Sequence, residues 1–228
     1  MNPSSFLPAA VIFDMDGVLV DTNPFHVQKW EGLLTEYGIA FERKTLPKRV
    51  LGPGNDVTLR HFFGERITAD DRRRLGEELE ARFRRAFAPH AKPLPGVERL
   101  ISECHEHGVP VALASAAMSK NVVFILDALK LRSHFHVVLT GDEITQTKPH
   151  PEIFSKAAQK LGLRPAHCVV LEDSFAGIEA AKSAGMKCVA VASTFSAAEL
   201  AAQTKADLVI QNLEALNLQR LKELFGMA

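Results

Sequence analysis

The sequence has 228 residues, enough for one or two domains, and hydrophobic residues make up 46% of it. This fraction is typical of globular proteins and is too high for an intrinsically disordered chain. Lys plus Arg and Asp plus Glu number 27 each, so no excess charge favours nucleic acid or an anionic membrane as a partner.

The first predicted element is a short apolar strand over Ala9–Phe13. The pattern then changes, because residues 21–93 show helical periodicity and no convincing strand. This stretch is typical of a helical unit inserted directly after the first strand. We therefore expect two domains: a core of residues 1–20 and 94–228, and a helical domain of residues 21–93.

Three helices are predicted in the inserted unit. Asn23 is expected to cap the first helix, which carries Pro24 in its first turn and ends at Gly38. The second spans residues 56–63, and the third begins at Thr68 with a sequence typical of a capping box. The apolar face of the third helix repeats every four residues, at Leu75, Leu79, Phe83 and Phe87.

From residue 95 onward, short apolar runs alternate with amphipathic stretches. Such runs, bounded by polar or Gly-rich turns, are typical of buried parallel strands. A glycine closes each of three predicted helices, over residues 96–107, 151–161 and 175–184, as is common at helix C-termini. The alternation predicts a doubly wound α/β fold. Further strands are expected at Val109–Ala114, Val137–Leu139, Cys168–Leu171, Lys187–Val191 and Asp207–Ile210.

The cysteines and the first residues bear on the compartment. Cys104, Cys168 and Cys188 are odd in number and widely spaced, which argues against a disulfide framework or a zinc site. Residues 1–8 lack a basic segment and a long apolar run, and no stretch approaches the ~20 apolar residues of a membrane span. We expect a cytoplasmic protein with buried cysteines and no membrane or nucleic-acid partner.

Two aspartates lie at the carboxyl end of the first predicted strand. Asp14 closes the strand, and Asp16 follows two residues later in the turn. Two carboxylates in a crevice are costly unless one gains a proton or a cation neutralises them. The pair therefore indicates either a metal site or an acid/base dyad.

A second acidic pair, Glu172 and Asp173, closes a later strand. Open α/β sheets bind ligands at the carboxyl ends of their strands, so both pairs are expected at the same edge. No His or Cys has ligand spacing nearby, and oxygen ligands of this kind suit Mg²⁺ better than Zn²⁺. The sequence therefore predicts a magnesium site.

Two further residues are placed to receive an anion. Lys148 lies in a loop that prolines hold stiffly just before a helix, which suits charge neutralisation. Ser115 ends a strand before another helix, so its hydroxyl and the adjacent N–H groups, including that of Ala116, can receive an anionic oxygen. Each of these four signals is weak alone, but their joint placement at successive strand ends favours a functional site.

The order of these residues resembles the four motifs of the haloacid dehalogenase superfamily. The motifs are Asp14-Met15-Asp16-Gly17-Val18, Ser115, Lys148 and Glu172-Asp173, and the match spans nearly the whole chain. The resemblance implies a Rossmann-like core and an α-helical cap made by residues 21–93. Within the superfamily the chain is most similar to beta-phosphoglucomutases and related sugar-phosphate phosphatases.

The resemblance also implies roles for the residues. Asp14 would attack phosphorus to form an aspartyl-phosphate, and Asp16 would protonate the leaving oxygen and then activate water. Ser115, Ala116 and Lys148 would hold the phosphoryl oxygens. The dehalogenases themselves displace halide and need no such acid, so Asp16 favours phosphate chemistry. Mg²⁺ would be bound by the Asp14 side chain, the Asp16 carbonyl, Glu172 and Asp173.

In the cap, the resemblance implies substrate contacts for His26, Gly52 and Asn55. His26 is expected to face either the active-site cleft or a polar helix contact. Beta-phosphoglucomutases grip a second phosphate with a cap arginine, and Asn55 stands where that arginine would be. An uncharged amide cannot make the bidentate, charge-assisted contact that arginine gives a phosphate.

We therefore expect hydrolysis of a small phosphorylated metabolite, a sugar or polyol monophosphate, by a monomer or weak homodimer. A phosphosugar mutase of the beta-phosphoglucomutase type is the alternative, because Lys48, Arg49 or Arg60 could replace the missing arginine. A catalytically silent phosphate-binding or interaction protein is the third hypothesis, which the complete set of motif residues disfavours.

Overall fold

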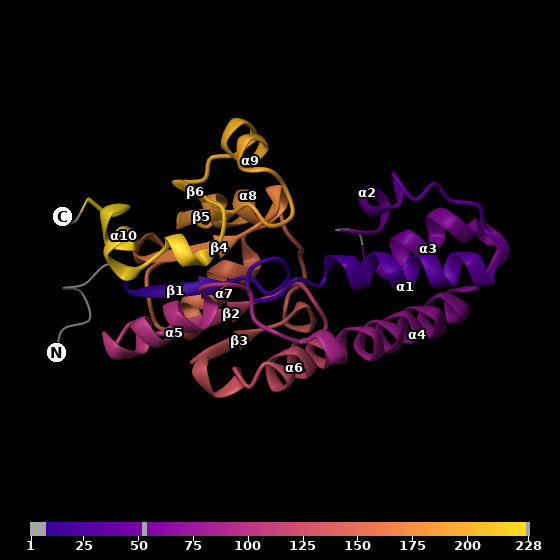
Figure 1. Ribbon diagram of the computed structural model, residues 1–228, viewed down its shortest axis with the longest axis horizontal. Coiled ribbons are helices and arrows are strands. Elements are labelled where there is room, and N and C mark those ends of the chain that lie inside the picture. Colours follow the sequence, from indigo (N-terminus) through magenta and orange to yellow (C-terminus); the bar gives the residue numbers. More distant parts are fainter. Residues whose placement is uncertain (1–7, 52–53, 227–228) are drawn as a thin grey trace. The chain divides into compact units, whose positions relative to one another are not determined.

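The computed structural model describes residues 8–51 and 54–226. Within these residues six strands form one sheet in the order β3-β2-β1-β4-β5-β6, and every neighbouring pair is parallel. Figure 1 shows the strands side by side with helices around them. The doubly wound α/β prediction is confirmed. The strands are β1 (Ala10–Phe13), β2 (Val111–Ala114), β3 (Val137–Leu139), β4 (Cys168–Glu172), β5 (Lys187–Val191) and β6 (Leu208–Ile210).

Helices follow the strands in the alternation that the sequence predicts. Gly108, Gly162 and Gly185 have positive φ angles just beyond α5, α7 and α8, which confirms the three predicted helix ends. Two short helices, α9 and α10, were not predicted, and Ser196 and Asn217 cap them through side-chain hydrogen bonds. The helices are α5 (Val97–Glu106), α6 (Ser119–Ala128), α7 (Glu152–Lys160), α8 (Phe175–Ser183), α9 (Ala197–Gln203) and α10 (Leu218–Glu223).

The sheet is buried on both faces. Ala10 and Ile12 of β1 point into an apolar cluster that includes side chains of α7, α8 and α9. Side chains alternate along a strand, so Val11 and Phe13 point to the opposite face, where α5 packs against β2 and α10 packs against α5. Two covered faces explain why the strands are near-continuous apolar runs.

Residues 22–91 form a separate compact unit, which we call the helical unit. Trp30, Leu33, Leu59 and Leu79 belong to its core. The apolar face predicted for the third helix is buried as expected. The helices of this unit are α1 (Asn23–Glu36), α2 (Leu46–Val50), α3 (Asn55–Phe63) and α4 (Ala69–Phe87).

The first turns of α1 and α4 differ in how they are capped. Thr68 and Asp71 form the capping box that the sequence predicts at the start of α4. The prediction that Asn23 caps α1 is wrong, because Asn23 is the first helical residue and Thr22 occupies the cap position, where its side chain makes no capping hydrogen bond to the helix. Pro24 in the first turn has no N–H to satisfy, which reduces the need for a side-chain cap.

The described residues up to Asp21, together with those from Lys92 onward, form the second compact unit, which we call the sheet unit. The range expected from sequence for the helical domain is 21–93. All three cysteines are buried and free, as predicted. Within residues 8–51 and 54–226, no helix has the length and apolar character needed to cross a bilayer.

Candidate active site

Asp14 extends directly from the carboxyl end of β1. Its N–H donates to the Leu171 carbonyl of β4 (3.0 Å), so the parallel pairing of the two strands continues into the site. The same pairing brings Asp14 to the level of Glu172, the last residue of β4. The order of strands diverges on either side of β1, and this switch point is where open α/β sheets bind ligands.

Three carboxylates meet at this edge of the sheet unit. One oxygen from each of Asp14, Glu172 and Asp173 lies within 4.8 Å of the others, and all three residues are buried. Lys148 joins two of them, because its Nζ donates to Asp14 Oδ1 (2.5 Å) and to Glu172 Oε1 (2.6 Å). The structure therefore brings together four residues that lie up to 159 positions apart in the sequence numbering, from Asp14 to Asp173.

The electrostatic balance of this cluster is unfavourable without a further cation. Burial raises the pKa of Asp14 to about 7, the charges of Glu172 and Asp16 add to that effect, and Lys148 opposes it. Burial and the charges of Glu172 and Asp14 also raise the pKa of Asp173 well above its usual range. Burial alone would lower the pKa of Lys148, but its two carboxylate partners raise it. One ammonium facing three carboxylates leaves a negative excess that a divalent ion would balance.

The donor set fits Mg²⁺. Carboxylate oxygens at the end of two strands are the hard ligands that this ion prefers, and within the described residues this is the one acidic cluster with metal-ligand spacing. Gly17 leaves room for the Asp173 carboxylate of this cluster. A Cβ at Gly17 would lie 1.9 Å from Asp173 Oδ2, and the φ angle of Gly17 is +78°. A larger residue at this turn would displace the Asp173 carboxylate.

Several polar groups hold the carboxylates in place. Glu172 Oε2 accepts hydrogen bonds from the backbone N–H (2.6 Å) and the hydroxyl (2.9 Å) of Ser174. The Thr194 hydroxyl donates to Asp173 Oδ2, and the Ser193 hydroxyl donates to the Gly17 carbonyl (2.5 Å). The sequence analysis did not identify Ser193 and Thr194. Their place just after β5 is the signal that could have found them, because they share the carboxyl edge of the sheet.

Asp16 and Ser115 lie in turns at the same edge. Asp16 is half-buried, and the turn that holds it is closed by a bridge to Val20. Ser115 is buried, and its N–H donates to the Leu139 carbonyl (3.0 Å), so this N–H is already engaged. Its hydroxyl oxygen accepts from Ala117 N (3.1 Å), which leaves the hydroxyl hydrogen for an anion. Ala116 is exposed beside it.

The remaining predicted site residues belong to the helical unit. The His26 ring stacks on Phe83, with ring centroids 4.3 Å apart and planes 6° from parallel, a contact that the sequence analysis did not anticipate. Asn55 begins α3, and its side-chain N–H donates to Glu80 Oε1 (2.6 Å). Glu80 also accepts from Lys29 (2.5 Å), and both residues of this ion pair are buried. Gly52 lies outside the described residues.

Comparisons with known proteins identify the family of the chain. The model of the haloacid dehalogenase-like hydrolase family matches residues 11–191. A beta-phosphoglucomutase of Bacillus subtilis is 31% identical over 94% of each chain, and a phosphorylated carbohydrates phosphatase of Thermotoga maritima is 32% identical over 78% of this chain and 82% of its own. The crystal structure of a beta-phosphoglucomutase from Clostridium difficile superposes with a TM-score of 0.83 at 28% identity, covering 96% of this chain and 97% of that one. The chain belongs to the haloacid dehalogenase-like hydrolase family.

Proposed function

We propose that the chain is a Mg²⁺-dependent phosphomonoester hydrolase that works through an aspartyl-phosphate on Asp14. The observation that carries this proposal is the cluster of Asp14, Glu172 and Asp173 within 4.8 Å, with Lys148 bridging Asp14 and Glu172. Phosphoryl transfer needs a positioned nucleophile and fixed positive charge around the phosphoryl oxygens. When bound, Mg²⁺ would supply further positive charge for the phosphoryl oxygens.

The reaction divides into two balanced steps. A carboxylate oxygen of Asp14 forms a bond to phosphorus as the substrate's ester oxygen leaves, and Asp16 gives that oxygen its proton. Asp16 then takes a proton from water, whose oxygen attacks phosphorus and breaks the bond to Asp14. Free phosphate and the original carboxylate result. Lys148 favours the ionised form of Asp14 that the first step requires.

We infer that the substrate is a sugar or polyol monophosphate. One support is the names of two relatives, a phosphorylated carbohydrates phosphatase and a beta-phosphoglucomutase. The second is the surroundings of Asn55, which we propose contacts the substrate. Its amide N–H is engaged by Glu80, so its oxygen is oriented as an acceptor that suits a hydroxyl group.

The phosphosugar mutase remains the second candidate because of its relative in Bacillus subtilis. A mutase must hold a second phosphate. Two cations near Asn55 are already paired with carboxylates, whereas Arg49, another possible replacement for the missing arginine, contacts His61 and no carboxylate among the described residues. Arg60 is paired with Asp56 (2.8 Å), and Lys29 is paired with Glu80. The carboxylate of Glu80 next to Asn55 disfavours a phosphate dianion there. We therefore favour hydrolysis.

A panel of phosphorylated sugars and polyols tests both candidates, with released phosphate and isomerised sugar phosphate measured in each reaction. We expect phosphate release that EDTA abolishes and Mg²⁺ restores. Asp14→Asn keeps the size of the side chain but removes the nucleophile, so turnover should be lost. Asp16→Ala should lower turnover by ~10²–10⁴-fold.

Two results would contradict the proposal. Turnover by Asp14→Asn comparable to wild type would remove the covalent mechanism. Efficient conversion of beta-glucose 1-phosphate to glucose 6-phosphate, with little phosphate released, would establish the mutase instead.

A further inference from the structure

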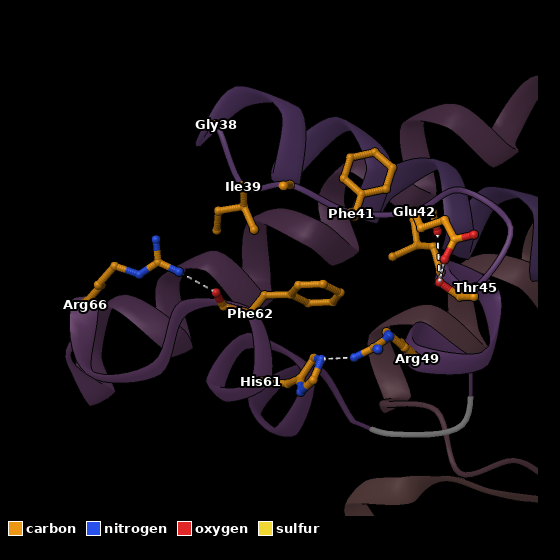
Figure 2. A pocket seen from close by; sticks show the side chains of 11 residues that line it. Gly38, Ile39, Phe41, Glu42, Thr45, Arg49, His61, Phe62 and Arg66 are labelled. Carbon is orange, nitrogen blue, oxygen red and sulfur yellow. Dashed lines mark hydrogen bonds between the residues drawn. The ribbon is translucent and has the colours of Figure 1, made fainter.

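A pocket in the helical unit has no part in the proposed reaction. It has a volume of about 490 Å³, and its described lining comes from residues 38–46, from Arg49 of α2, and from residues 61–66. Figure 2 shows Ile39, Phe41 and Phe62 around it, with the rings of Phe41 and Phe62 on facing sides. These three side chains are half-buried and pack against the core of the unit, so they form the apolar part of the pocket, while Glu42, Arg49, His61 and Arg66 of its lining are exposed.

The polar side of the pocket carries an unusual pair. Arg49 Nη1 and His61 Nε2 lie 2.5 Å apart and point toward each other in Figure 2. A guanidinium can only donate hydrogen bonds, so His61 Nε2 is the acceptor in this contact. The partner of Arg49 is therefore an imidazole and not a carboxylate.

This pairing differs from that of six other arginines in the same unit, although Arg85 also has no carboxylate within ion-pair distance among the described residues. Among the described residues, Arg49 has no carboxylate within ion-pair distance. Arg66, which also lines the pocket, donates to the backbone carbonyls of Phe62 (2.7 Å) and Phe63 (3.1 Å). Six arginines of the helical unit pair with carboxylates, namely Arg43, Arg60, Arg72, Arg73, Arg74 and Arg82.

One carboxylate lies among the described lining residues. Glu42 accepts a hydrogen bond from the Thr45 hydroxyl (3.2 Å), and in Figure 2 it lies at the opposite end of the pocket from Arg66. Its charge opposes an anion in the pocket, whereas Arg49 and Arg66 favour one. Two arginines and one carboxylate thus give the described lining a net positive charge.

We propose that this pocket binds a small organic oxyanion, with a carboxylate or phosphate group held by Arg49 and His61 and an apolar body against Phe41 and Phe62. An oxyanion would give Arg49 the charge-assisted hydrogen bonds that its imidazole partner cannot supply. The other ring nitrogen of His61, Nδ1, would donate to the same anion. Half-buried aromatic walls suit a ligand with a flat apolar part.

Solution NMR of the full chain tests this site, with the ring signals of His61 as a local probe. The ligands are benzoate, phenylphosphonate and inorganic phosphate, so the carboxylate, the phosphate group and the apolar body are compared directly. We expect a saturable shift of the His61 signals with at least one aromatic anion, and weaker binding of inorganic phosphate. The tighter of the two aromatic ligands identifies the preferred oxyanion.

Variants distinguish binding in this pocket from a general effect of the protein's charge on anion binding. Arg49→Gln should weaken binding by about tenfold or more, because a charge-assisted hydrogen bond is lost. Glu42→Gln should strengthen it, because a repelling charge is removed. Arg73→Gln is the matched control, since Arg73 is an exposed arginine of the same unit that does not line the pocket, and it should leave affinity unchanged.

The proposal fails if neither aromatic anion gives a saturable shift at His61, or if Arg73→Gln weakens binding as much as Arg49→Gln. If inorganic phosphate binds as tightly as phenylphosphonate, the apolar body of the ligand does not contribute to binding, which contradicts the proposal. If Arg49→Gln unfolds the helical unit, His61→Gln replaces it, with the backbone amide of Phe62 as the probe. Unchanged affinity in His61→Gln would also overturn the assignment.

Discussion

At the scale of single residues, the candidate active site depends on Lys148. Its Nζ contacts both Asp14 and Glu172, so one side chain neutralises part of the charge at two strand ends. Its side chain is 10% exposed and lies over the Phe154 ring, 4.9 Å from the centroid. The apolar ring of Phe154 beneath the buried ammonium limits the motion of the Lys148 side chain and keeps water away from it.

The first prediction separates the metal site from the phosphate site. Asp173→Asn removes a charge from the proposed Mg²⁺ ligands, so it should weaken Mg²⁺ affinity by about tenfold or more. Lys148→Ala removes a positive charge, so it should leave Mg²⁺ affinity equal or higher while weakening phosphate binding. Calorimetric titrations with Mg²⁺ and with phosphate measure both constants. Equal Mg²⁺ affinity in the two variants would show that the metal site is elsewhere.

At the scale of elements, two junctions between helices and strands position residues of the sheet unit. One joins α8 to β4, and the other joins α8 to β5 through Asp207. The first turn of α8 lies in close contact with the Glu172 side chain at the end of β4. A Cβ added at Gly177 would lie 1.7 Å from Glu172 Oε1. Glu172 is buried and tied to Lys148 and Ser174, so its carboxylate has little room to move. At the other junction, Asp207 lies just before β6 and joins α8 to β5.

The second prediction uses the glycine of α8. Gly177→Ala should displace the Glu172 carboxylate and lower both Mg²⁺ affinity and turnover. Gly32→Ala is the matched control, because a Cβ there would meet only Arg82, 3.8 Å away, within another helix. That control should stabilise the protein by roughly 0.5–1 kcal/mol and leave Mg²⁺ binding unchanged. Wild-type Mg²⁺ affinity in Gly177→Ala would mean that Glu172 is not a ligand.

The third prediction concerns pH. Burial raises the pKa of Asp207, but hydrogen bonds from Lys182, the Cys188 N–H and Lys187 outweigh burial and lower it overall. A carboxyl with a lowered pKa in the folded state stabilises the protein above its unfolded pKa, ~3.9. That contribution is lost as the pH falls through the folded pKa.

Asp207→Asn should therefore cost about 1–3 kcal/mol of unfolding free energy at neutral pH. The difference from wild type should shrink as the pH falls below ~4, where Asp207 gains a proton in the unfolded chain, and it should vanish below the lower pKa of the folded protein. Urea titrations at several pH values measure it. A constant difference from pH 7 down to about 3 would exclude a role for the charge.

At the scale of the whole molecule, the chain builds two units with separate cores. The helical unit buries Trp30, Leu59 and Leu79 among its own helices, while the sheet unit packs α7, α8 and α9 on the strands. The residues of each of these two clusters come from one unit, so we expect a change in the stability of the helical unit to leave the strand ends that hold the carboxylates in place.

The fourth prediction tests that independence. Leu79 is fully buried in the core of the helical unit, so Leu79→Ala should cost about 2–5 kcal/mol of local stability. Hydrogen exchange measured by mass spectrometry should rise across residues 22–91 and stay unchanged in β1 and β4. Mg²⁺ affinity should also stay unchanged. Faster exchange in both units together would show that they unfold as one.

The sequence by itself determined the strands, three of the helix C-termini and the residues of the candidate active site. Near-continuous apolar runs appear wherever a strand is buried on both faces, and Gly108, Gly162 and Gly185 mark helix ends because positive φ favours glycine. Asp14 and Glu172 could be placed at one edge because the ends of parallel strands meet. These are local signals, or signals that follow from the topology of one sheet.

Only the tertiary structure decided which side chains meet. The spacing of charges along α4 does not show that Glu80 is buried, because its burial depends on Lys29 of another helix. Thr194 holds Asp173 although the two lie on loops after different strands. Nothing in the sequence indicates that Arg49 and His61 meet. The packing of α2 and α3 brings them together. Contacts of this kind follow from packing between elements, which no local pattern in a single sequence records.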